Sequence, residues 1–477
     1  MNLSQTLSQI IASLPALWAE YMLIFGILGM VIIMLIFPKK KQLFGILFGV
    51  LTLATAALIL PFCPQKSDLF LGMLRTDRTV IAMKSLLFFA GIATFFYQLF
   101  LPSNAEDKPA GEWFPLILTL ILGGSLMVMS TNLLMMYVAT EIVSISSYLL
   151  ATLRKNNPQA AEAGIKYTLF GAFASAIMIY GISWFYGCTG TLDLTQGAWV
   201  ENMNHLPLFT QTIVYLLIFV GFLFKINAIP LHFWTPDVYE GTDFGTAALF
   251  SVVPKVAALV MWVNLLRLFP LSATLQTVLI GLAILSMTAG NIAAIGQTNV
   301  KRLLAYSSIA HSGFLLMALL PQTAYSYKAL FFYLWVYTCM NLAIFFATGY
   351  ISALISSEKI SDFQGLGKYF PLITVCLVVL LFSLTGLPPT AGFIAKWYVF
   401  LAVWEKWTDS QQLIWLIALI SAVLNTVISL FYYMRLPVMM VFRPAKREVF
   451  SPKNIGMSLL IGLLTALILA GGIFVRN

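Results

Sequence analysis

The sequence predicts an all-α, polytopic membrane protein, and three observations lead to this fold class. Of the 477 residues, 60% are hydrophobic and only 9% are charged, whereas a soluble domain has about 45–50% apolar and about 25% charged residues. The apolar residues form blocks of about 20, the length of a helix that crosses a bilayer. The connectors between the blocks are short and polar. No stretch is long enough for an extramembrane domain, so soluble enzymes are excluded.

The hydrophobic blocks and the breaks between them predict about fourteen transmembrane helices. The predicted spans are residues 17–37, 42–62, 80–101, 114–130, 132–151, 160–186, 209–229 continuing to 239, 244–268, 273–296, 302–320, 327–355, 370–387 continuing to 404, 411–435 and 455–475. They group into an N-terminal three-helix region, two repeats and a C-terminal helix, over residues 1–113, 114–268, 269–440 and 441–477.

The distribution of basic residues predicts the orientation in the membrane. The net charge of +9 favours nucleic-acid binding in a soluble chain, but here the position of the charges matters more than their sum, and we expect no nucleic-acid partner. If the Lys39-Lys40-Lys41 loop lies inside, alternate loops place fifteen basic residues on that side and six on the other. Because basic loops stay on the cytoplasmic side, both termini are predicted outside, in a multi-pass protein of the inner (plasma) membrane.

Two long hydrophobic segments are interrupted by proline. The seventh span contains Ile229-Pro230 and the twelfth contains Pro388-Pro389. The segments are five spans apart and therefore run in opposite directions, which indicates that spans 4–8 and 9–13 are inverted repeats. Discontinuous helices in inverted repeats mark an ion or substrate site near the bilayer midplane. Two unrelated proline kinks are the alternative, since proline is common in membrane helices.

Ionisable residues inside the predicted spans are the candidate functional groups, because each costs at least about 2.5–3.5 kcal/mol at the centre of a membrane helix. Four lysines lie deep in their spans: Lys166, Lys225, Lys255 and Lys396. Glu141 is the clearly central acid. It is the natural counter-charge for Lys166 or Lys225.

Local pairing is the alternative for some of these groups. Glu162 lies one turn before Lys166, so the two can form a salt bridge along one helix face. We expect Lys84 and Lys328, near helix ends, to snorkel toward the interface. His311 lies in the middle of the tenth span beside serines, and an imidazole exchanges protons near neutral pH through either nitrogen. A histidine that only bonds to those serines is the structural alternative.

One central carboxylate against several amines favours protons over sodium as the transported ion. Desolvation lowers the proton affinity of a lysine and a nearby carboxylate raises it, so movement of Glu141 relative to a lysine loads or unloads a proton. Sodium sites use carboxylates and carbonyl oxygens instead. The four cysteines are far apart without a CxxC pair, and no GxGxxG or P-loop motif is present. We therefore expect free thiols, no metal site and no redox cofactor in this chain.

Three longer motifs carry a resemblance to a known family. They occupy residues 233–241 (FWTPDVYEG), 301–311 (KRLLAYSSIAH) and 383–396 (SLTGLPPTAGFIAK). Together they resemble the antiporter-like membrane subunits of respiratory complex I, and the WTPDVY stretch is similar to the subunit N branch of NADH-quinone oxidoreductase. The predicted spans extend the resemblance over nearly the whole chain.

The resemblance implies a proton-translocating subunit whose partners are other membrane subunits and lipid. The family's proton-transfer positions correspond to Glu141, Lys166, Lys225, Lys255, His311 and Lys396. Quinone, FMN and iron–sulfur clusters are then expected in partner subunits. One departure is Gly241-Thr242-Asp243, where the family usually has a Gly-Ala-Pro-like turn. The alternatives are a subunit of a cation/proton antiporter and a scaffold without transport, and costly buried lysines argue against the scaffold.

Overall fold

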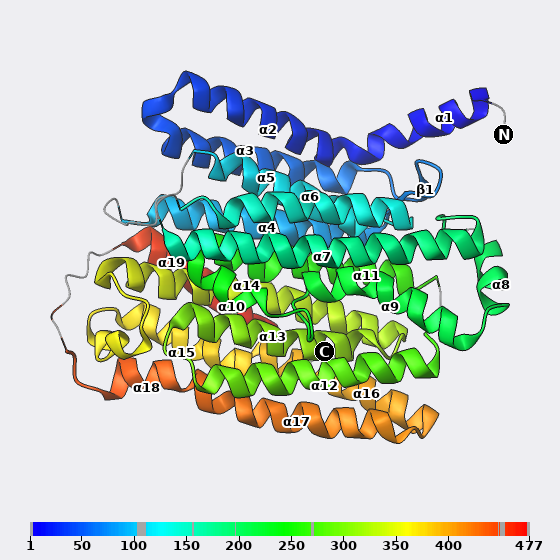
Figure 1. The fold of residues 1–477 in the computed structure, drawn as a ribbon. Helices are drawn as coiled ribbons and strands as arrows, with labels where there is room; N and C mark the ends of the chain where they lie inside the picture. Colours follow the sequence, from blue (N-terminus) through cyan, green and yellow to red (C-terminus); the bar gives the residue numbers. More distant parts are fainter. Residues whose placement is uncertain are drawn as a thin grey trace.

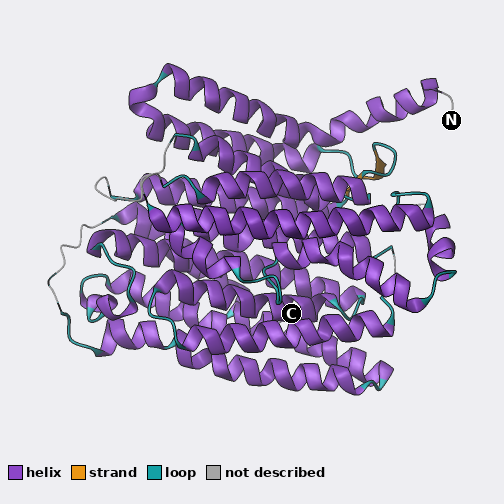
Figure 2. Cartoon of the chain, in the orientation of Figure 1, coloured by secondary structure: helices purple, strands orange, loops and turns teal. Residues whose placement is uncertain are grey.

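The computed structural model describes residues 3–102, 111–154, 157–195, 197–268, 271–446, 448 and 454–474. Nearly all of the described chain is helical, and most helices lie side by side in one bundle (Figure 1, Figure 2). Some basic residues that the orientation prediction uses lie outside the described residues: Lys108, Lys155, Arg447, Lys453 and Arg476.

The first half of the chain contains a series of helices and one small hairpin. The helices are α1 Leu3–Ser13, α2 Trp18–Ile36, α3 Lys41–Ile59, α4 Arg78–Phe100, α5 Trp113–Met129, α6 Leu133–Ala151, α7 Pro158–Thr189, α8 Ala198–Asn204, α9 Leu208–Lys225, α10 Trp234–Gly241 and α11 Phe244–Leu266. Strands β1 Lys66–Leu69 and β2 Leu74–Thr76 pair antiparallel. The sequence analysis did not predict α1, α8 or this hairpin.

The second half is helical throughout its described part. Its α-helices are α12 Ala273–Ile295, α13 Val300–Leu319, α14 Ala324–Ile355, α15 Pro371–Thr385, α16 Ala391–Ser410, α17 Leu413–Tyr433, α18 Arg435–Phe442 and α19 Ile455–Phe474. Short 3-10 turns complete the elements of both halves: Leu14–Leu17, Pro38–Lys40, Leu60–Phe62, Ile360–Phe363 and Leu366–Lys368.

The lengths and apolar composition of these helices confirm a multi-pass membrane protein. Twelve helical segments of the described chain are long and apolar enough to cross a membrane. Two shorter apolar helices, α5 and α15, lie where the fourth and twelfth spans are predicted. α11 is the central helix of the bundle, because every one of its side chains is buried.

Both predicted helix breaks are present. α9 ends at Lys225 and α10 begins at Trp234, while α15 ends at Thr385 and α16 begins at Ala391. Proline causes each break locally, since it lacks the backbone N–H that an α-helix needs and its ring clashes with the preceding turn. The prediction of two discontinuous helices is therefore confirmed.

The two halves repeat the same order of helices. α5 packs on α6 and α11, just as α12 packs on α13 and α17. The third helix of each half, α7 or α14, is 32 residues long and contacts both parts of the broken helix that follows it. Helices α1–α3 lie at one edge of the bundle and α17 lies at the opposite edge (Figure 1). This arrangement places the two breaks in equivalent positions of the two halves.

Candidate functional site

Lys225 lies at the first break and binds a hydroxyl. It is the last residue of α9 and is 3% exposed, and its ammonium donates to the Ser144 hydroxyl at 2.8 Å. Ser144 lies on α6 one turn after Glu141, whose carboxylate accepts a hydrogen bond from Ser175. Glu141 interacts electrostatically with Lys225. Among the described residues Glu141 forms no direct ion pair.

The unwound residues after Lys225 connect the break to α13. Asn227 has a positive φ of 53°, which turns the chain out of the helix. Its amide nitrogen donates to the Ser308 hydroxyl at 3.3 Å, and its amide oxygen accepts from Ser312 at 2.9 Å. The Ser312 hydroxyl also donates to the carbonyl of Ile226. Non-helical backbone is tolerated at membrane depth where protein groups satisfy it in this way.

Lys255 lies in the middle of α11 and is 1% exposed. Its Nζ lies 2.6 Å from the Ser308 carbonyl oxygen, 2.8 Å from the Ser308 hydroxyl and 3.3 Å from the Tyr337 hydroxyl. The Ser308 hydroxyl also lies 3.0 Å from that of Tyr337 and 3.4 Å from that of Tyr239. Since Ser308 also accepts from Asn227, it connects the central lysine to the first break.

His311 lies one turn further along α13 and contacts two tyrosines. Its Nδ1 is 2.8 Å from the Tyr333 hydroxyl and its Nε2 is 3.2 Å from the Tyr433 hydroxyl. The Tyr433 hydroxyl also bonds to Ser307. The alternative in which serines hold the imidazole is therefore wrong. Both ring nitrogens contact groups that carry an exchangeable proton.

Lys396 lies just after the second break and is 3% exposed. Its Nζ donates to the carbonyl of Thr385 at 2.9 Å and lies 4.6 Å from the centre of the Phe314 ring. Thr385 ends α15, and carbonyls at a helix C-terminus are unsatisfied and carry partial negative charge. The break thus provides the acceptor for the lysine. His311 interacts electrostatically with Lys396 and with the central lysine of α11.

Lys166 binds two carboxylates, one on its own helix α7 and one in the first turn of α10. Its side chain is 38% exposed and forms ion pairs of 2.6 Å with Glu162 and with Asp237. The i,i+4 salt bridge with Glu162 is therefore confirmed. Asp237 also pairs with Arg302 at 2.8 Å. Among the described residues, the ion-pair partners of Lys166 are therefore Glu162 and Asp237 and do not include Glu141.

The charged cluster around α10 extends to α13 and to the segment after α14. Arg302 also pairs with Glu240 at 2.7 Å. Lys301 is fully buried and pairs with Glu358 at 2.6 Å. The ion pairs of Arg302 hold the short second part of the broken helix against α13, and the ion pair of Lys301 joins α13 to the segment after α14.

The unusual Gly241-Thr242-Asp243 loop forms a helix cap. The carboxylate of Asp243 accepts from the backbone N–H of Thr246 at 2.9 Å and from its hydroxyl at 2.5 Å. An aspartate in this position satisfies the free donors at the start of a helix, here α11. The Thr242 carbonyl accepts from Lys301 at 2.7 Å. Although this loop differs from the family's usual turn, these hydrogen bonds hold it in place between α10 and α11.

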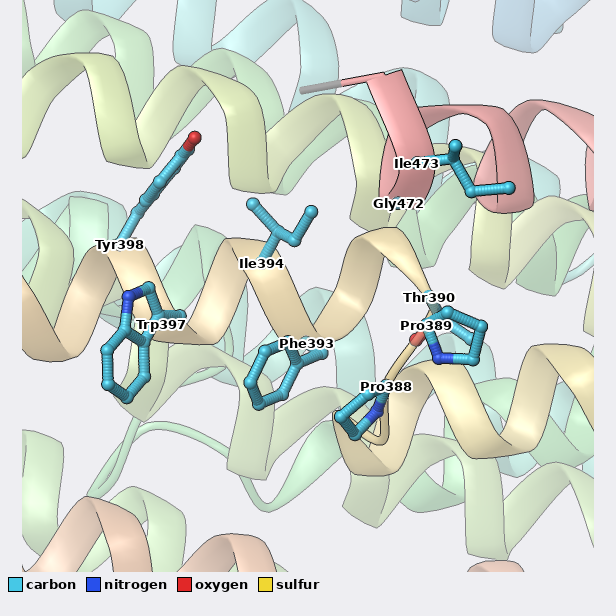
Figure 3. Close-up of a pocket in the computed structure, with 9 residues that line it drawn as sticks. All are labelled: Pro388, Pro389, Thr390, Phe393, Ile394, Trp397, Tyr398, Gly472 and Ile473. Atoms are coloured by element: carbon cyan, nitrogen blue, oxygen red, sulfur yellow. The ribbon is translucent and has the colours of Figure 1, made fainter. Parts of the chain in front are cut away.

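A cavity of about 370 Å³ lies beside the second break (Figure 3). Its walls include Pro388, Thr390 and Trp397, together with Gly472 near the end of α19. Lys396 does not line the cavity; its amine bonds to the end of α15 instead. We assign the cavity no part in proton transfer.

The described residues contain no group of three or more histidine, cysteine or acidic side chains that suits a metal ion. All four cysteines are free thiols, as expected from their separation in the sequence. The ionisable groups of the site are therefore the amines, the carboxylates and the imidazole described above.

Comparison with known proteins identifies the family. The model of the family described as NADH:quinone oxidoreductase/Mrp antiporter, TM, matches residues 130–429, a range that includes both helix breaks. The chain belongs to this antiporter family. It is 35% identical over 493 residues to NADH-quinone oxidoreductase subunit N of Anaeromyxobacter sp. (strain Fw109-5), covering 96% of this chain and 94% of that relative. It is 37% identical to NADH-quinone oxidoreductase subunit N 2 of Chloroherpeton thalassium, covering 85% and 81%.

Chains in two solved structures have the same fold. A chain of respiratory complex I from Thermus thermophilus superposes with a TM-score of 0.77 at 28% identity, covering 95% of this chain and 98% of that chain. A chain of the Mrp complex from Dietzia sp. superposes with a TM-score of 0.79 at 18% identity, covering 96% and 94%. At this lower identity the likeness shows the fold alone.

In this antiporter-family chain, the charged groups of the site are evident from the sequence, whereas the hydroxyls that connect them are not. Ser308, Tyr337 and Tyr433 each bond to a predicted site residue or to its partner. The sequence could have indicated one pair of these hydroxyls. Tyr333 and Tyr337 are four residues apart and therefore lie on one face of a helix. Which helix that face meets depends on the tertiary fold.

The expected snorkelling of Lys84 is wrong. Its side chain is 0% exposed and pairs with Glu20 at 2.6 Å. Glu20 is itself 2% exposed near the start of α2, a buried acid that the sequence did not single out. Lys328, by contrast, is exposed near the start of α14, as expected.

Proposed function

We propose that this chain is the proton-translocating subunit N of an NADH-quinone oxidoreductase in the inner (plasma) membrane, with both termini outside. Relatives of that name at 35–37% identity support the assignment. NADH oxidation and quinone reduction then take place in partner subunits, which hold the FMN and the iron–sulfur clusters. This chain contributes the membrane part of the proton path, and other membrane subunits and lipid surround it.

Protons move along the buried amines and the imidazole in this proposal. The order along the bundle is Lys225, Lys255, His311 and Lys396. The observation that carries it is the position of Ser308, which bonds to Lys255 and to Asn227 of the first break. Hydroxyl groups both donate and accept hydrogen bonds, so this connection passes a proton in either direction.

Glu141 and Lys166 act on the first-repeat side of this series, on α6 and α7. Glu141 supplies a negative charge one turn before Ser144, whose hydroxyl binds the amine of Lys225. Lys166 exchanges protons with the carboxylates around α10, which it contacts directly. The two repeats then correspond to residues 114–268 and 269–440, each with one helix break.

The test replaces Lys255 by methionine in the intact complex and measures protons pumped per NADH oxidised in inverted membrane vesicles. Methionine keeps much of the volume of the side chain but binds no proton. We expect pumping to be lost while assembly persists. The exposed lysine variant Lys328→Gln is the matched control and should pump normally. Normal pumping by Lys255→Met would refute the route.

A sodium-free medium separates this function from the alternative of a cation/proton antiporter. Proton pumping by the complex should be unchanged when sodium is replaced by choline, because the buried site offers several amines and few carboxylates. A pumping rate that falls with sodium removal would favour the antiporter alternative.

A further inference from the structure

A buried ion pair lies in the N-terminal helices, outside the route described above. Glu20 of α2 and Lys84 of α4 are 2% and 0% exposed, and their Oε1 and Nζ atoms are 2.6 Å apart. Ser125 of α5 donates to the same Oε1 at 2.5 Å, and Lys84 also lies 3.5 Å from the sulfur of Met129. These helices lie together at the N-terminal edge of the bundle (Figure 1).

Packing alone does not require this pair. α2 and α4 already contribute fully buried apolar side chains to the core, among them Leu23 and Leu87. Two buried charges cost more desolvation than their attraction returns in many proteins, and apolar replacements of such pairs are often neutral or stabilising. Ionisable residues inside a membrane protein are for this reason functional candidates together with their partner.

The geometry leaves one oxygen of Glu20 without a partner. Lys84 and Ser125 both bind Oε1, whereas Oε2 is buried and has no hydrogen-bond partner among the described residues. A buried acceptor without a partner is unfavourable, and a proton on Oε2 removes its charge. Lys84 lies six residues after Arg78, about 9 Å of helical rise, so the pair is close to the end of α4 that follows the β1–β2 hairpin.

We propose that Glu20, Lys84 and Ser125 form an additional proton-holding site near this end of the bundle. A proton that enters forms an O–H bond at Oε2, which leaves a neutral carboxylic acid beside the charged ammonium. When that O–H bond breaks again, the proton leaves and the ion pair is restored, so one proton enters and one leaves in each cycle. The O–H bond of the hydronium ion that delivers the proton breaks as the Oε2–H bond forms, and an O–H bond of the same kind forms on water when the proton leaves.

The site is connected to the first repeat through α5. Ser125 and Met129 both belong to α5, the helix that also packs on α6 and α11. A movement of α5 would therefore change the contacts that Ser125 and Met129 make with Glu20 and Lys84. The inference rests on the proposed proton translocation, but it uses none of the residues of the Lys225-to-Lys396 route.

The first experiment removes both charges in the intact complex. The double variant Glu20→Leu/Lys84→Met keeps similar side-chain volume, and Leu23→Met on the same helix is the packing control. We expect the double variant to assemble and to oxidise NADH while fewer protons are pumped per electron in inverted vesicles. The control should keep the native ratio. A native ratio in the assembled double variant would overturn the inference.

A second measurement does not depend on the double variant folding. Infrared difference spectra of the complex before and after NADH addition report carboxyl groups that gain or lose a proton. Glu20→Asp keeps the acid but changes its carbonyl frequency, so a band of the native spectrum should shift in this variant. A spectrum identical to the native one would overturn the inference even if the double variant fails to assemble.

The Lys255→Met variant separates the two proposals. If Lys255→Met loses pumping while the Glu20/Lys84 double variant pumps normally, the additional site is refuted and the route is retained. If both pump normally, the proposed function of this chain is refuted as well.

Discussion

The ammonium of Lys255 binds both oxygen atoms of Ser308, at 2.6 Å from the carbonyl and 2.8 Å from the hydroxyl. Among the described residues no carboxylate forms an ion pair with this lysine. A neutral amine retains two N–H donors, and a hydroxyl rotates to donate when needed. Lys255 therefore keeps its contacts when it loses a proton, and no ion pair has to break.

Ser308→Ala should weaken proton transfer without unfolding the chain. The hydroxyl that Lys255, Tyr337 and Asn227 share disappears, while the carbonyl remains. Because a hydrogen bond to a charged group contributes about 1.5–3 kcal/mol, we expect pumping per electron to fall by roughly tenfold. The measurement is proton uptake by inverted vesicles. Thr338→Val is the control, since that buried hydroxyl only bonds to Leu334 of its own helix, and equal pumping by both variants would contradict the prediction.

Glu141→Gln should lower pumping while the complex still assembles. Glutamine has the size of glutamate and continues to accept from Ser175, but it has no charge to stabilise the protonated form of Lys225. The expected result is a reduced proton-to-electron ratio at an unchanged amount of assembled complex. Unchanged pumping would show that Glu141 has no part in transport, although its hydrogen bond is intact.

The prolines predict the helix breaks from the local sequence alone. The side chains that surround the site residues depend on long-range packing and could not be predicted in this way. Pro230 and Pro388-Pro389 break their helices wherever these lie in the fold, because the effect of proline on the backbone is local. The tyrosines of His311 come from α14 and α17, the latter 122 residues away. Only the tertiary fold brings such groups together, and the nearby serines were therefore a misleading guide.

The position of Lys84 relative to its helix end was misleading for a similar reason. Counting residues from Arg78 places the amine close to the interface, where a lysine reaches water. The packing of α3 and α5 against α4 closes that path, and α2 supplies Glu20 as a partner instead. Burial of a side chain depends on the neighbouring helices, which a hydropathy pattern does not specify.

Asp237→Asn should destabilise the charged cluster around α10. Asp237 holds both Lys166 and Arg302, but it is 26% exposed, so solvent screening limits the loss to about 1 kcal/mol. We expect a lower Tm of the purified complex, with a smaller difference at high salt because salt screens exposed charges. Glu162→Gln removes one pair at a more exposed position and should have a smaller effect. If Glu162→Gln lowered the Tm more than Asp237→Asn, the prediction would be wrong.

Gly386→Ala should disturb Lys396 through the backbone. Gly386 has a φ of 89°, in the left-handed region that costs other residues about 1–2 kcal/mol. A Cβ at this position would lie 2.9 Å from the Cδ of Lys396, which pushes the amine away from Thr385. We expect lower pumping and a lower Tm. Gly281→Ala in α12 is the control, since nothing lies within 4 Å of its Cβ position, and an equal loss there would argue against the contact with Lys396.

Lys396 is the predicted carrier on the outer side of the second break. α16 continues to Ser410, beyond the predicted end at residue 404. About 21 Å of helix therefore separates the amine from that end, more than the sequence suggested. A proton released here needs additional groups or water to reach the surface, whereas the bond to the Thr385 carbonyl holds the amine at the break.

Two substitutions of Lys396 separate its charge from its proton exchange. Lys396→Ala removes the proton-binding amine without adding a buried charge. Lys396→Arg keeps the charge, but a guanidinium hardly ever releases its proton. Both should therefore impair proton pumping in membrane vesicles, although only the first loses the charge. If Lys396→Arg pumped normally, charge alone would suffice at this position, and the carrier role would have to be abandoned.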